Sequence, residues 1–102
     1  MDSKIQEIYL SGEGQEDNGS DAHNTDVIVR LEDGSVYAAS FFTYDDIERI
    51  RREHQRDGEF LNGKYFWAEQ MVLVDSCSRA DVTAVVEHML ETGDFLELFR
   101  RL

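Results

Sequence analysis

The sequence has no proline and only one cysteine. The first fact bears on the backbone, and the second on disulfides and on the cellular compartment. Without proline, no residue forces a kink in a helix or introduces a slow cis–trans isomerisation step. The one cysteine, Cys77, cannot form a disulfide within the chain, and such sparse use of cysteine is typical of a reducing compartment. We therefore expect a cytoplasmic protein whose fold is held together without disulfides.

Basic residues and long apolar runs are scarce as well. The chain has 10 lysines and arginines against 22 aspartates and glutamates, and its formal net charge is −12. Such a field repels nucleic acids and anionic membranes and attracts basic proteins, although solubility alone is another reason for an acidic surface. The N-terminal segment MDSKIQEIYL lacks the pattern of an export signal, and no apolar run is long enough to cross a membrane. We expect neither direct nucleic-acid binding nor membrane insertion.

The chain has 102 residues, which suffice for one domain, residues 1–102, with one core.

The first half of the chain is predicted to form strands. Residues 4–10 predict a strand, and the polar, acid-rich residues 11–24 predict a mobile loop. Residues 25–42 predict a hairpin, because Asp33 and Gly34 suit the two positive-φ positions of a type I′ turn. The second face of this hairpin is half apolar, so a helix or a partner chain should cover part of it. The first face should be core, with Val27, Val29, Leu31, Val36, Ala38 and Phe42.

The second half predicts helices and further strand. Thr43, Ser78 and Asp94 each stand three residues before an acid, as in a capping box. The helices that they open should lie near residues 44–56, 79–91 and 95–102. Residues 64–74 predict one bent strand or two short ones with a break at 68–70. The chain should therefore form an α+β domain in which helices pack on a small antiparallel sheet.

The first predicted helix contains the only basic cluster, RIRREHQR at 49–56. Alone, this cluster could contact phosphates. However, Asp45 with Arg49 and Glu48 with Arg52 are spaced for ion pairs along one helix, and these pairs would leave the helix surface nearly neutral. We expect a solvated, self-paired face.

The runs SFFTYDDI, GEFLNGKYFWAEQMVLV and GDF resemble a group of small, acidic, uncharacterised bacterial proteins, over about residues 25–102. The resemblance implies a bacterial source and a shared plan of hairpin, helix and strand, and it implies no catalytic residue. In size and acidity the chain is more loosely similar to toxin-immunity proteins and anti-CRISPR proteins. Proteins of both kinds act by occupying basic or nucleic-acid-binding surfaces.

Groups that could support catalysis or bind a metal are few. The three histidines lack the spacing of a metal-binding motif. Cys77 precedes a predicted helix start, where a thiolate is stabilised, but no histidine is near it in sequence, and a small buried thiol is the more ordinary role. Asp45 and Asp46 are explained by their place in the first turn of a helix. We expect no enzyme activity, no cofactor and no metal site.

These observations favour a non-enzymatic binding protein. Tyr65 and Trp67 are either buried in the core or exposed beside acids, and the second case would resemble a binding hot spot. We expect the protein to dock on and block a basic or nucleic-acid-binding surface of a nuclease, a toxin or a similar protein. The alternative is a homodimeric module with a structural or regulatory role. The residues expected to contact a partner are Glu13, Glu16, Asp17, Asp21, Asp26, Glu59, Tyr65, Trp67 and Glu69.

Overall fold

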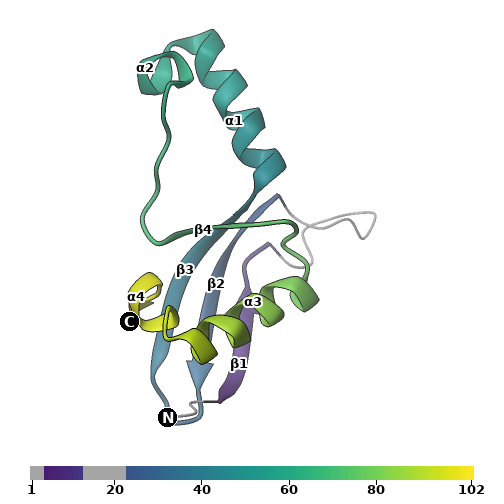
Figure 1. The fold of residues 1–102 in the computed structure, drawn as a ribbon, viewed down its shortest axis with the longest axis vertical. Helices are drawn as coiled ribbons and strands as arrows, with labels where there is room; N and C mark the ends of the chain where they lie inside the picture. Colours follow the sequence, from purple (N-terminus) through teal and green to yellow (C-terminus); the bar gives the residue numbers. More distant parts are fainter. Residues whose placement is uncertain (1–3, 13–22) are drawn as a thin grey trace.

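One five-stranded sheet organises the chain, of which the computed structural model describes residues 4–12 and 23–102 (Figure 1). Strands β1, β2 and β3 pair antiparallel in chain order. The outer edge of β3 is shared, because β4 pairs with one half of it in parallel and β5 with the other half antiparallel. The strands are β1 (Ile5–Leu10), β2 (Asn24–Leu31), β3 (Val36–Thr43), β4 (Met71–Val74) and β5 (Arg100–Arg101).

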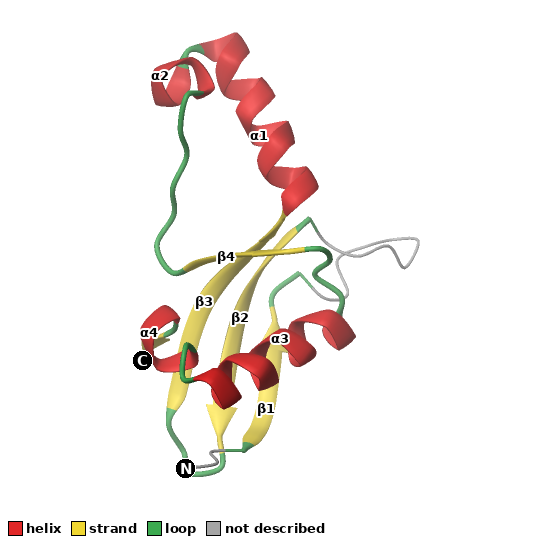
Figure 2. Cartoon of the chain, viewed as in Figure 1, coloured by secondary structure: helices red, strands yellow, loops and turns green. Residues whose placement is uncertain are grey.

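The helices fall into two groups. Figure 2 shows α3 and α4 on one face of the sheet, whereas α1 and α2 extend past its end. The predicted α+β class is thereby confirmed, with a sheet that is antiparallel apart from the β3–β4 pair. The helices are α1 (Tyr44–Asp57), α2 (Glu59–Gly63), α3 (Arg79–Thr92) and α4 (Phe95–Leu98).

The core lies between the sheet and the pair α3 and α4. Alternate strand residues point into it, and Val27, Val29 and Phe41 have no exposed surface. Helix α3 contributes Val82 and Val86, which lie four residues apart and therefore on the same side of the helix. The helix predicted near residues 79–91 is therefore confirmed, with one apolar side against the sheet.

The loop between β2 and β3 differs from the predicted type I′ turn. Of its three residues, 32–34, Gly34 has a positive φ (90°) and Asp33 does not. The Gly34 amide donates to the Leu31 carbonyl, and the Leu31 amide donates to the Ser35 carbonyl, each at 2.9 Å. This is the pattern of a type I turn followed by a left-handed glycine, which holds one residue more than a type I′ loop.

The longer loop moves the register of the hairpin by one residue. Arg30 pairs with Val36, where a two-residue turn would have paired Leu31 with it. Because side chains alternate along a strand, the shift exchanges the two faces of β3. The buried face carries Tyr37, Ala39 and Phe41, and the predicted core residues Val36, Ala38 and Phe42 lie on the opposite face.

The predicted helix at 95–102 is only partly present, because α4 ends at Leu98. Phe99 is extended (φ −88°, ψ 142°), and the next residues form β5. Two effects favour this change. Phe95 and Phe99 stack in the core with ring centroids 4.4 Å apart, and β5 pairs the part of the β3 edge that β4 leaves open.

The predicted strand at 64–74 is wrong in its first part, since only Met71–Val74 pair with β3. Residues 65–68 form neither helix nor strand. Aromatic residues favour strands in general, but here the Phe66 ring packs against His54 of α1 with centroids 6.0 Å apart, and Tyr65 and Trp67 are exposed. Of the predicted helix caps, Thr43 and Ser78 are confirmed, because each side chain accepts from an amide three residues later. Asp94 makes no such bond.

Candidate functional site

A projecting arm, which comprises α1, α2 and residues 64–70, extends past the end of the sheet (Figure 1). Helix α1 leaves the sheet at the end of β3, and residues 64–70 return from α2 to the start of β4. The molecule is correspondingly elongated, with principal extents of 46 × 32 × 21 Å. The arm therefore presents to solvent a surface that is separate from the core.

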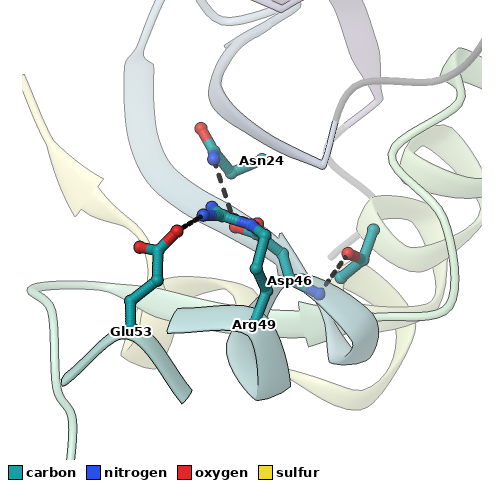
Figure 3. Close-up of polar contacts among 5 residues, drawn as sticks. Asn24, Asp46, Arg49 and Glu53 are labelled. Carbon is teal, nitrogen blue, oxygen red and sulfur yellow. Dashed lines mark hydrogen bonds and ion pairs between the residues drawn. The ribbon is translucent and has the colours of Figure 1, made fainter. Parts of the chain in front are cut away.

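Asp46 anchors the base of the arm (Figure 3). Its side chain is fully buried, and Arg49 donates to Oδ1 from Nε at 3.0 Å and from Nη2 at 2.7 Å. The Asn24 amide group donates to Oδ2 at 3.2 Å, which ties α1 to the start of β2. The hydrogen bonds to Asp46, together with its charge, raise the pKa of the Arg49 guanidinium. Both carboxylate oxygens have partners within the fold, so Asp46 acts as a structural anchor.

Aromatic rings join α1 to the returning segment. The ring of His54 stacks on Phe60 with centroids 4.7 Å apart. Phe60 contacts Phe66 at 5.2 Å, and Phe66 contacts Phe42 of β3 at 6.0 Å. This row of four rings runs from α1 to the sheet and holds residues 64–70 in place.

The turn that positions Phe60 has a left-handed backbone. Phe60, Leu61 and Asn62 have φ values of 52°, 53° and 59°, a conformation that costs roughly 1–2 kcal/mol per residue for amino acids with a Cβ. Gly63 ends the turn at φ 78°, where a Cβ would lie 2.6 Å from the Arg51 carbonyl oxygen. Packing of the Phe60 ring offsets part of this cost.

The outer surface of the arm exposes large apolar side chains. Leu61 is 68% exposed, Tyr65 53% and Trp67 62%. Glu59 and Glu69, in the same part of the chain, are exposed as well. Burial of the aromatic strip, one of the two interpretations of the sequence, is therefore wrong for Tyr65 and Trp67. The arm combines exposed aromatic side chains with nearby acids, which is the composition expected of a binding hot spot.

The remaining predicted contact residues are placed differently. Asp26 lies on β2 and shares a hollow of about 250 Å³ with Glu69 and Arg100. Arg100 was missed because its place was predicted as helix, and Leu61 because it lies between the helix and the strand predicted at 44–56 and 64–74. Four predicted residues lie outside the described part of the chain, and these are Glu13, Glu16, Asp17 and Asp21.

The charged side of α1 is largely self-paired. Glu48 accepts from Arg51 at 3.1 Å and from Arg52 at 3.2 Å, so the predicted Glu48–Arg52 pair is confirmed. The predicted pair of Asp45 with Arg49 is wrong, because Arg49 binds the buried Asp46 and, at 2.6 Å, Glu53. The buried Asp46 carboxylate would be costly without a charged partner, which favours this choice.

Side chains that could support catalysis or bind a metal do not come together in the described part of the chain. Cys77 is buried, with its sulfur 3.8 Å from the Phe41 carbonyl oxygen. Within residues 4–12 and 23–102, histidine, cysteine and acidic side chains do not gather in a group of three that could hold a metal ion. Nor does any described helix have the length and apolar character needed to cross a membrane. Comparisons with protein-family models, with curated proteins and with solved structures found no match to this chain.

Proposed function

We propose that the protein is a non-enzymatic inhibitor that docks on and blocks a basic or nucleic-acid-binding surface of another protein, in the manner of toxin-immunity and anti-CRISPR proteins. The observation that carries the proposal is the exposure of Tyr65 and Trp67 on the projecting arm of a strongly acidic chain. The following steps connect this surface to such a partner.

The aromatic side chains would supply most of the affinity. Tyr65 and Trp67 are each more than half exposed, and Leu61 adds further apolar surface on the same arm. Trp and Tyr are the residues most enriched among those whose truncation costs roughly 2 kcal/mol or more of binding energy. We therefore expect these two rings to enter pockets of the partner.

The acidic side chains would give specificity for a basic partner and raise the rate of association. A net charge of −12 attracts a basic surface over a distance set by ionic strength, and it repels the nucleic acid that such a surface would otherwise bind. Glu59 and Glu69 are exposed in the same part of the chain and would form the charged rim of the contact.

The anchoring of the arm would limit the cost of binding. Asp46 fixes the base of α1, and ring contacts from His54 through Phe60 to Phe66 fix the returning segment. A surface that is already ordered before binding loses less conformational freedom when the complex forms.

Affinity capture tests the proposal. The immobilised protein is exposed to extracts of the cells that produce it, and bound proteins are released with a salt gradient and identified. We expect a partner with net positive charge that elutes as salt rises, because screening weakens attraction between opposite charges. We further expect that adding the purified protein blocks the partner's binding to DNA or RNA, or its toxic activity.

The variant Tyr65→Ala/Trp67→Ala should lose this partner and its inhibition. Tyr44→Ala is a matched control, because Tyr44 is 56% exposed but lies at the first residue of α1, outside residues 64–70. A partner that is held equally well by the double variant, or that elutes independently of salt, would contradict the proposal.

A further inference from the structure

The face of the sheet opposite α3 and α4 carries side chains from β1, β2 and β3 that lie side by side and are exposed or partly exposed. The pairing register places Tyr9 of β1 beside Ile28 of β2, and Ile28 beside Ala38 of β3. Tyr9 is 56% exposed, and Ile28 and Ala38 are partly exposed. The helices that pack on the described part of the sheet do so on its other face, through Val82, Val86 and Phe95. We call the surface formed by Tyr9, Asp26, Ile28, Arg30 and Ala38 the open face.

Strand β2 gives the open face a pattern of charge that complements itself. Asp26, Ile28 and Arg30 point to this face in turn, since they alternate with the buried Val27 and Val29. The order along the strand is therefore acid, apolar, base. If β2 of a second copy lies antiparallel opposite this strand, Asp26 of each copy faces Arg30 of the other, and Ile28 faces Ile28. A two-fold axis at Ile28 that lies between the two sheets, perpendicular to the strands, relates the two copies in this way.

We propose that a second copy of this chain packs on the open face. Ile28 of one chain lies against Ile28 of the other, and Asp26 of each chain faces Arg30 of the other. The two sheets then form a layered packing with their strands roughly antiparallel between the layers. The open face borders the arm at Glu69, but the inference does not use Tyr65 or Trp67 and does not rest on the proposed inhibitory function.

The charges on the open face are available for such a contact. Arg30 Nε lies 4.0 Å from Glu7 Oε1, and the two side chains are 49% and 72% exposed. Asp26 accepts one bond from the Ser40 hydroxyl, at 3.3 Å. These are long and solvent-exposed contacts, which contribute little to stability and can be exchanged for intermolecular ones at small cost.

The charge balance of the open face also favours a second copy over other occupants. Acids on or beside it, Glu7, Asp26 and Glu69, are nearly matched by Arg30 and Arg100, although the whole chain carries −12. Two chains therefore repel less through this face than through an average part of their surface. A basic partner would meet two arginines here, and an apolar helix would leave Asp26 and Arg30 without a counter-charge.

Sedimentation equilibrium of the purified chain tests the proposal without any other protein. At physiological ionic strength the Debye length is about 8 Å, so repulsion between the acidic bodies is largely screened. We expect a reversible monomer–dimer equilibrium. Asp26→Arg and Arg30→Asp should each weaken dimerisation by about tenfold or more, because like charges then face each other, and the double variant should return to about the native constant.

A matched control and a second readout keep the test decisive. Arg52→Glu reverses a charge on α1, away from the open face, and should leave dimerisation unchanged. Ile28→Cys should be cross-linked between two chains by a short bis-maleimide reagent, because the two-fold axis brings this residue opposite itself and two packed sheets lie about 10 Å apart. Ala84→Cys, exposed on α3, should not, and the native Cys77 can remain because it is buried.

Circular dichroism establishes that each variant is folded before its mass is interpreted. A native chain that stays monomeric at every concentration would overturn the proposal. So would a dimer in which the double charge reversal fails to restore association, or in which Ile28→Cys and Ala84→Cys cross-link equally.

Discussion

Asp33 fixes the loop between β2 and β3 through two bonds to its side chain. Ser35 donates to Oδ1 from its amide at 2.9 Å and from its hydroxyl at 2.5 Å. Both hydrogen bonds lower the pKa of Asp33, and the bond from the Ser35 hydroxyl has the larger effect. Folding thus favours the ionised carboxylate. The stabilisation is present above the pKa of the unfolded chain and is lost as pH falls through the lower pKa of the folded protein.

We predict that NMR titration of the Asp33 carboxyl group gives a lower midpoint in the native protein than in Ser35→Ala. The variant removes the hydroxyl donor and should move the midpoint back toward the ordinary value for aspartate. Ser76→Ala is the control, because Ser76 bonds Ser78 and Asp81 and lies outside the loop. An Asp33 midpoint that is the same in the native protein and in Ser35→Ala would contradict this account.

Asp46 illustrates a buried charge that is held by its partners. We predict that Asp46→Asn lowers the free energy of unfolding by about 2 kcal/mol, because two charge-assisted bonds from Arg49 lose their anionic acceptor. Urea unfolding at neutral pH measures the change. The neighbouring Asp45 is exposed, and Asp45→Asn should cost less than about 1 kcal/mol through the helix dipole alone. Equal losses in the two variants would show that the buried cluster contributes nothing particular.

At the level of elements, the left-handed turn of the arm depends on Gly63. We predict that Gly63→Ala destabilises the protein by more than Gly34→Ala in urea unfolding. Both glycines have positive φ, 78° and 90°, so both variants carry the conformational cost of about 1 kcal/mol. Only at Gly63 does the added Cβ meet backbone, 2.6 Å from the Arg51 carbonyl oxygen, whereas Gly34 has open space. A larger loss at Gly34 would contradict the geometry of the arm.

Local patterns in the sequence predicted several of the elements. β1, the β2–β3 hairpin, α1 and α3 follow from alternation, from helical spacing and from the caps Thr43 and Ser78. The register of the hairpin did not follow, because a loop of two or three residues fits the same Asp33-Gly34 pair. Where pairing partners are distant, as for β5 against β3, local helical spacing was misleading.

Only part of the candidate site was predicted, because the rest depends on contacts between residues that are distant in sequence. The residue types of Tyr65 and Trp67 indicated a hot spot, but their exposure depends on how Phe66 between them packs on rings of α2 and β3. The complementarity of Asp26, Ile28 and Arg30 was hidden as well, since it requires knowing that α3 and α4 both pack on the other face. Long-range packing decided both outcomes.

At the scale of the whole molecule, an excess of twelve negative charges acts on the fold itself. Like charges on a small body repel one another and favour the expanded, unfolded chain. Helix α3 carries this repulsion locally, because Glu87 and Glu91 are exposed four residues apart and its last turn contains no basic residue. An acid near a helix C-terminus is also disfavoured by the helix dipole.

We predict that Glu91→Lys raises the thermal midpoint of unfolding by roughly 3 °C at low ionic strength, which corresponds to about 0.5 kcal/mol for a domain of this size. The substitution replaces a like-charge pair with a favourable pair from Glu87 and places a cation at the negative end of α3. Calorimetry in low and high NaCl measures the effect, which should shrink as salt screens both terms. Glu91→Gln should give an intermediate midpoint. A Glu91→Lys midpoint at or below the native value in low salt would show that repulsion among the surface acids does not limit the stability of this fold.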